Sequence, residues 1–138
     1  MSQENVEIVR SLFEEFNRGD YSAAVDFLHP GANVYPGVVG LDPLGAGSGD
    51  HLSGRDEVRR FFEDLGETWD AVTVEFDELI EAVDGTVVSV ELWRTRGRDG
   101  IEIISPITDV YTLRDGVIVR VDGFVDKADA LEAFGLSE

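Results

Sequence analysis

The chain has 138 residues, 43% of them hydrophobic and 29% charged, which is typical of one globular domain, placed here at residues 1–138. It carries 29 acidic against 11 basic residues, a net charge of −18, and such a surface repels phosphate groups, so we exclude nucleic acids and membranes as partners. The absence of cysteine excludes disulfides and cysteine-ligated zinc, and the N-terminal residues lack the pattern of a secretory signal, which predicts a cytoplasmic location.

The first half of the chain predicts three helices. Residues 4–17 place apolar side chains at helical spacing, which is typical of a helix with one buried face. A second, short helix is expected over residues 21–28, where a His-Pro-Gly sequence ends it, and a third over residues 55–65, with Ser53 as its N-cap. Residues 36–54 are rich in glycine and predict a long loop.

From residue 72 onward the apolar pattern changes to strict alternation, which predicts strands. Asp-Gly pairs at residues 84–85 and 115–116 predict tight turns between antiparallel neighbours. The expected strands cover residues 72–77, 86–96, 101–113 and 117–125, and a last short helix covers residues 127–134. Helices followed by a meandering antiparallel sheet define an α+β fold with helices on one face of the sheet.

Three segments carry motifs that encode helix ends, turns and core positions. They are Phe16-Asn17-Arg18-Gly19-Asp20 after the first helix, Gly54-Arg55-x-x-Val58-Arg59-x-Phe61-Phe62 in the third helix, and Tyr111-Thr112-Leu113-Arg114-Asp115-Gly116 at the last turn. Together with the order of elements, they make nearly the whole chain similar to SnoaL-like proteins of the nuclear transport factor 2-like, or ketosteroid isomerase-like, superfamily. Because that superfamily includes isomerases, cyclases, hydrolases and non-enzymatic binders, the resemblance implies a fold more than an activity.

The resemblance implies a curved, mostly antiparallel sheet that wraps the N-terminal helices as a cone-shaped barrel. Inside the cone it implies a pocket for a small apolar or amphipathic molecule, and it implies a homodimer that pairs through the sheet. The strand over residues 86–96 is consistent with a covered outer face, because Val88, Val90 and Leu92 alternate with Val87 and Trp93. Ordinary strand propensity explains the same pattern without a partner.

The most informative polar residue of the predicted sheet is Asp109. Alternation places its side chain on the same face as Ile107 and Tyr111, in a largely apolar row. Burial raises the pKa of a carboxyl group, and a carboxyl kept neutral at pH 7 donates a hydrogen bond to an oxyanion. The resemblance places Asp109 at the oxyanion-hole aspartate of ketosteroid isomerase. The alternatives are an ion pair with Arg94 or Arg96, or exposure at a bulge.

The remaining catalytic sets of the superfamily do not match this chain. The segment Asn33-Val34-Tyr35-Pro36 contains no acid where the isomerase has its proton-shuttling carboxylate, and Leu12 replaces the tyrosine of its first helix. Limonene epoxide hydrolase needs an arginine and two aspartates, and the positions that match them here are occupied by Glu91, Trp93 and Gly123. Alternation turns Gly123 inward and Asp122 outward, which also removes the final-strand aspartate of SnoaL-type cyclases.

We therefore expect a small-molecule enzyme that transfers protons without a cofactor or a metal, of the isomerase, cyclase or hydrolase type, on an apolar oxygenated substrate. Asp109 would hold or donate a proton, Glu91 would act as the base, and Tyr35 would help to orient the ligand. The alternative is a non-catalytic ligand-binding or dimerising protein, and a third hypothesis assigns acid/base work to His51. The expected lining of the pocket comprises Leu12, Phe16, Phe62, Trp93, Tyr111 and Gly123.

Overall fold

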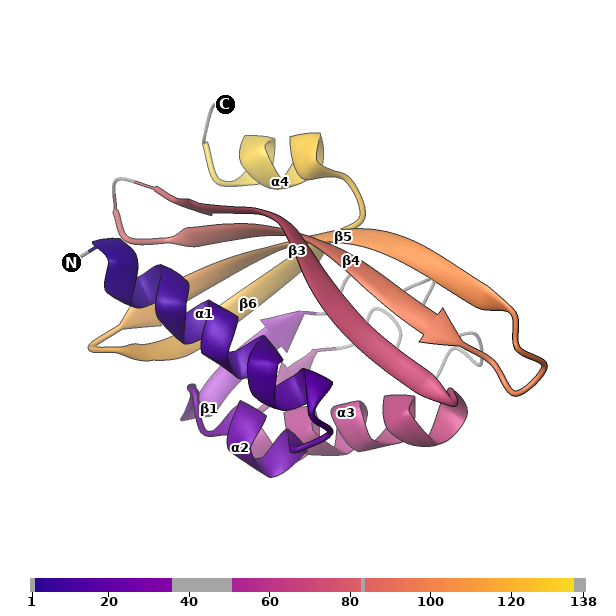
Figure 1. Cartoon of the computed structure of the whole chain (residues 1–138). Coiled ribbons are helices and arrows are strands. Elements are labelled where there is room, and N and C mark those ends of the chain that lie inside the picture. Colours follow the sequence, from indigo (N-terminus) through magenta and orange to yellow (C-terminus); the bar gives the residue numbers. More distant parts are fainter. Residues whose placement is uncertain (1, 36–50, 83, 136–138) are drawn as a thin grey trace.

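The computed structural model describes residues 2–35, 51–82 and 84–135, and within these ranges it has four helices and one sheet of six strands. The helices are α1 (Ser2–Asn17), α2 (Tyr21–Val25), α3 (Arg55–Thr68) and α4 (Lys127–Ala133), and the strands are β1 (Leu28–Tyr35), β2 (Leu52–Ser53), β3 (Ala71–Glu81), β4 (Val87–Arg96), β5 (Glu102–Arg114) and β6 (Val117–Phe124). Helices α1, α2 and α3 lie on one face of the sheet, and α4 lies on the other (Figure 1).

The strand order is β2-β1-β6-β5-β4-β3, with neighbours antiparallel except for the parallel pair β1 and β6. The α+β fold and the four-strand meander predicted from the sequence are confirmed. The sheet is not closed, however, since β2 and β3 form its two edges. The cone is therefore an open, curved sheet rather than a complete barrel.

The segment that follows α2 is the main correction to the predicted elements. Helix α2 ends at Val25, and β1 begins three residues later, at Leu28. The strand contains the His-Pro-Gly sequence, which was expected only to end a helix. The pairing of β1 with β6 shifts register between Leu28 and Asn33, so Pro30 lies in an irregular part of the strand. This bulge is why no alternating pattern is visible in the sequence of β1.

The predicted loop over residues 36–54 also needs correction at its end, where residues 52–53 form the short strand β2; residues 36–50 lie outside the described residues. The N-cap of α3 is Gly54, at a φ of 87°, and not Ser53. The backbone N–H of Ser53 instead donates to the carboxylate of Glu57, at 2.8 Å. Among the described residues, no helix is long and apolar enough to cross a membrane.

The main core lies between the sheet and the three helices on its inner face. Helix α1 buries Val9, Leu12, Phe13 and Phe16 against the strands, as the helical spacing of the sequence predicts. Asn17, the last residue of α1, ties the helix to β3, because its side-chain amide donates to the carbonyl of Val74 and accepts from the N–H of the same residue, both at 2.9 Å. These two hydrogen bonds fix the C-terminal end of α1 against β3.

Candidate functional site

The candidate site is assembled by the register between β4 and β5. Ser89 pairs with Asp109, Glu91 with Ile107 and Val87 with Tyr111. Directly paired residues of antiparallel strands project from the same face of a sheet, so the carboxyl groups of Glu91 and Asp109 point to the same side. This is the inner face, which α1 and α3 cover, and both carboxyl groups are therefore removed from water.

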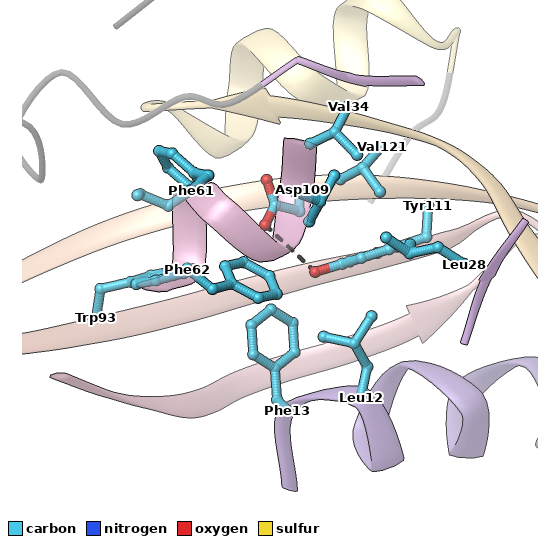
Figure 2. Close-up of a pocket in the computed structure, with 12 residues that line it drawn as sticks. Leu12, Phe13, Leu28, Val34, Phe61, Phe62, Trp93, Asp109, Tyr111 and Val121 are labelled. Atoms are coloured by element: carbon cyan, nitrogen blue, oxygen red, sulfur yellow. Dashed lines mark hydrogen bonds between the residues drawn. The ribbon is translucent and has the colours of Figure 1, made fainter. Parts of the chain in front are cut away.

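A cavity of about 50 Å³ lies between this part of the sheet and the helices. Figure 2 shows the Asp109 carboxyl group among apolar side chains, with a dashed line to the hydroxyl group of Tyr111. Five aromatic rings form much of the wall, and Asp109 is the only described residue of the lining with a carboxyl group. The lining comprises Leu12, Phe13, Leu28, Val34, Val58, Phe61, Phe62, Trp93, Ile107, Asp109, Tyr111 and Val121.

Behind the cavity wall, Glu91 is completely buried and has three hydrogen-bond partners. The hydroxyl groups of Ser89 and Tyr111 lie 2.8 and 2.7 Å from Oε2, and the indole N–H of Trp93 donates to Oε1 at 2.8 Å. Burial raises the pKa of Glu91 well above its usual range, and the charge of Asp109 and a hydrogen bond with it raise this pKa further. Hydrogen bonds that Tyr111 and Trp93 donate to the ionised form of Glu91 oppose this shift.

Asp109 is 8% exposed, and its Oδ2 lies 3.3 Å from the hydroxyl oxygen of Tyr111. Burial raises the pKa of Asp109 from 3.8 to about 6, against the lowering effect of its hydrogen bonds with Glu91 and Tyr111. The pKa of Tyr111 is also raised well above 10, chiefly by burial and then by the two carboxyl groups. Tyr111 therefore stays protonated while Asp109 titrates close to neutral pH.

The arrangement of donors indicates where the proton of the pair resides. The indole of Trp93 only donates, so Oε1 of Glu91 must accept and any proton on Glu91 sits on Oε2. The single hydrogen of the Tyr111 hydroxyl serves only one carboxyl group at a time. The Tyr111 hydroxyl lies 2.7 Å from Oε2 of Glu91 and 3.3 Å from Oδ2 of Asp109, and it donates to Glu91 when Glu91 is ionised. When Oε2 carries the proton, Glu91 can donate to Tyr111 instead, which frees the Tyr111 hydrogen for an ionised Asp109.

The expected alternative of an ion pair between Asp109 and an arginine is not what the structure shows. Arg94 projects from the opposite face of β4, where it contacts the carboxylates of Glu75 and Glu102. In the described part of the chain, no lysine or arginine forms an ion pair with Asp109 or Glu91. Only neutral donors and the carboxyl groups themselves stabilise the pair.

The other candidate residues divide into two groups. Leu12, Phe62, Trp93 and Tyr111 line the cavity, together with Phe13, Phe61 and five aliphatic side chains that were not among the candidates. Phe16 is buried behind Phe62 and Trp93, with ring centroids 4.9 and 5.4 Å away, and does not line the cavity. Gly123 pairs with Asp109 on β6 but is also absent from the lining.

Tyr35 and His51 lie together, and neither contributes to the cavity lining. Tyr35 follows Val34, which lines the cavity, so the Tyr35 side chain projects from the opposite face of β1. There it stacks on the imidazole of His51, with 4.7 Å between centroids, and the guanidinium of Arg120 also lies 4.7 Å from its centroid. The structure thus does not bring Tyr35 to Asp109 and Glu91.

Comparison with known proteins places the chain in a family. The model of the SnoaL-like domain matches residues 9–121, and the chain belongs to this family. No curated protein matches it.

Solved structures share the fold along almost the whole chain. An NTF2-like protein of unknown function from Burkholderia pseudomallei is 23% identical, with a TM-score of 0.75 and coverage of 94% of this chain and 95% of that one. The epoxide hydrolase/cyclase-like enzyme SalBIII, described in pyran ring formation in salinomycin, is 26% identical, with a TM-score of 0.74 and coverage of 94% and 97%. TerC, co-crystallised with polyporic acid, is 20% identical, with a TM-score of 0.75 and coverage of 94% and 96%.

Proposed function

We propose that this protein catalyses proton transfer on a small, apolar, oxygenated molecule, with Asp109 as the group that exchanges a proton with the substrate. One observation supports the proposal above all: a carboxyl group with a pKa of about 6 faces an otherwise apolar cavity. A general base is most effective when its pKa lies near the working pH. Two similar structures support this class of ligand, since SalBIII is an epoxide hydrolase/cyclase-like enzyme described in pyran ring formation and TerC was co-crystallised with polyporic acid.

The geometry favours an exchange of the roles expected from the sequence. Of the two carboxyl groups, only that of Asp109 lines the cavity, whereas Glu91 lies behind Tyr111 and is not part of the lining. We propose that ionised Asp109 takes a proton from a carbon next to a carbonyl group and returns it to another atom of the same molecule. No atom is gained or lost in such an isomerisation. Glu91 acts as a positioning residue, whose retained proton keeps Tyr111 directed at Asp109.

Deuterium exchange into acetone tests the proton-transfer step without knowledge of the substrate. We expect the wild-type protein in D2O to accelerate exchange of the acetone methyl hydrogens, measured by proton NMR, and Asp109→Asn to lower this rate about a hundredfold. Because ionised Asp109 is the base, the rate is expected to rise through about pH 6. Asp115→Asn, in the exposed turn between β5 and β6, is the matched control, since it removes one negative charge away from the cavity and should keep both the rate and the pH profile.

Equal exchange rates in the wild-type protein and Asp109→Asn would contradict the catalytic proposal and favour the alternative of a non-catalytic binding protein. The small size of the cavity favours that alternative. About 150 Å³ is needed to hold benzene, so a cavity of about 50 Å³ admits only a few non-hydrogen atoms unless side chains such as Phe61 move.

We also propose that two copies of the chain pair through the outer face of the sheet. Helix α4 covers Val88 and Val110 on this face, but the neighbouring Leu92 is only half-buried, and Ile104 is 47% exposed. Exposed apolar side chains on one face of a sheet suit an interface between identical copies.

We expect the wild-type protein to sediment as a dimer and Leu92→Glu to sediment as a monomer, because the new carboxylate would be desolvated at the interface. Glu102→Gln, at the edge of the same face, should leave the dimer intact. A wild-type protein that sediments as a monomer at high concentration would rule out this pairing.

A further inference from the structure

The charge of the carboxyl pair has no counter-charge near the cavity. All eleven lysines and arginines of the chain lie within the described residues, yet the ion pairs they form there involve other carboxylates, such as those of Glu75, Glu78 and Asp122. Asp109, with a pKa raised to about 6, is ionised at neutral pH, while burial raises the pKa of Glu91 well above its usual range, so the pair carries net negative charge. A buried charge without a partner destabilises the folded state, and a bound cation would remove that cost.

The hydrogen-bonding groups of the wall also favour a particular class of ligand. The lining contains two donor side chains, and both are committed to the carboxyl pair: the indole of Trp93 donates to Glu91, and the hydroxyl of Tyr111 lies between Glu91 and Asp109. Among the described residues, the lining therefore offers a carboxylate acceptor but no uncommitted donor side chain. This described lining favours a ligand whose N–H group donates to the Asp109 oxygens over an anion.

The aromatic walls complete this preference. Phe13, Phe61, Phe62, Trp93 and Tyr111 line the same cavity, and the faces of aromatic rings attract cations, most strongly where water is excluded. The net charge of −18 raises the local concentration of cations around the whole protein. Each of these features favours positive charge, and each is independent of any catalytic role.

We propose that the cavity is a binding site for small organic ammonium ions, which donate to the Asp109 carboxylate and contact the surrounding aromatic rings. This inference goes beyond the proposed function, because it concerns the charge of the ligand that the cavity prefers and not the reaction. Its size limits the ligand to primary, secondary or tertiary amines with about four non-hydrogen atoms. Such an ion would compete with a neutral substrate for the same space.

Three probes of equal size test the charge preference: isopropylammonium, isopropanol and acetone, each titrated into labelled protein at pH 8 and constant ionic strength. Binding is measured from the NMR shifts of the Trp93 indole N–H and the Tyr111 amide. We expect the wild-type protein to bind isopropylammonium at least about tenfold more tightly than either neutral probe, and Asp109→Asn to lose this preference. Asp115→Asn, in the exposed turn between β5 and β6, changes the net charge equally, so it should keep the preference if the charge beside the cavity is responsible.

A second arm varies the pH without any substitution. Protonation of Asp109 below about pH 6 should abolish the preference for isopropylammonium by pH 5. The titratable groups around Asp109 are Glu91 on β4, Tyr111 on β5 and Asp122 on β6; α1, α3 and β1 contribute only apolar side chains to the lining.

The outcomes separate this inference from the proposed function. If acetone binds as tightly as isopropylammonium while Asp109-dependent exchange persists, the cation site is wrong and the proposed catalysis stands. If isopropylammonium binding is equally strong in Asp109→Asn, the attraction comes from the surface charge of the protein and the inference is overturned. Preferential binding of isopropylammonium without deuterium exchange supports the cation site and contradicts the proposed catalysis.

Discussion

Replacing Asp109 with asparagine is expected to stabilise the protein at pH 8 and to change its stability little at pH 4. Burial raises the pKa of Asp109 from 3.8 to about 6. A carboxyl group whose pKa is raised by folding contributes its full stability below the unfolded pKa, near 4, and this contribution is lost as the pH rises through about 6. Since one pKa unit corresponds to about 1.4 kcal/mol, ionising Asp109 costs the folded state about 3 kcal/mol.

Urea unfolding at a series of pH values measures this effect. The free energy of unfolding of the wild-type protein should fall between pH 4 and pH 8 by about 3 kcal/mol more than that of Asp109→Asn. Repulsion among the 29 acidic residues lowers stability over the same range, so Asp115→Asn, with the same net charge and an exposed side chain, is the reference and should retain the steep fall. Parallel curves for the wild-type protein and Asp109→Asn would show that Asp109 titrates as an ordinary surface carboxyl.

Truncating Glu91 is expected to have the second large effect. Glu91→Ala leaves the indole of Trp93 and the hydroxyl groups of Ser89 and Tyr111 without their buried partner and opens a void. Buried donors without partners and cavities each destabilise a protein by one to a few kcal/mol, so we expect a loss of about 4 kcal/mol in the free energy of unfolding.

Glu91→Gln is the matched comparison. An amide resembles a protonated carboxyl group: its oxygen accepts from Trp93, and its NH2 group donates toward Tyr111, as the protonated Oε2 does. The cost is therefore expected to stay within about 1 kcal/mol. If Glu91→Gln destabilises the protein as much as Glu91→Ala at pH 7, Glu91 is ionised in the native protein and accepts all of its hydrogen bonds.

Much of the fold can be predicted from the sequence because the spacing of apolar residues follows which side chains are buried. Alternation identified the four long strands, and helical spacing identified the buried face of α1. Strand β1 escaped prediction because its burial does not alternate: after Leu28 three exposed residues follow before Ala32 is buried. Its place depends on a parallel pairing with β6, ninety positions away in the chain for Leu28 and Ile118, and no local pattern encodes such a contact.

The candidate site was predictable in part for the same reason. Alternation along β5 turns Asp109 and Tyr111 to one face, and alternation along β4 turns Glu91 and Trp93 to one face. The two pairs of side chains meet only in the observed register between β4 and β5. Alternation along each strand alone does not specify that register. The sequence predicts that the two carboxyl groups face one cavity, but the link between them through the Tyr111 hydroxyl group needs this register and is seen only in the structure.

The carboxyl carbon resonances of Asp109 and Glu91, followed by carbon-13 NMR from pH 3 to pH 9, test the central claim most directly. The structure predicts that Asp109 titrates near pH 6 and that Glu91 remains protonated beyond that point. If both resonances instead complete their shifts below pH 5, the two carboxyl groups are ionised together at neutral pH. The shared proton, the proposed base and the direction of the pH dependence would then all be wrong.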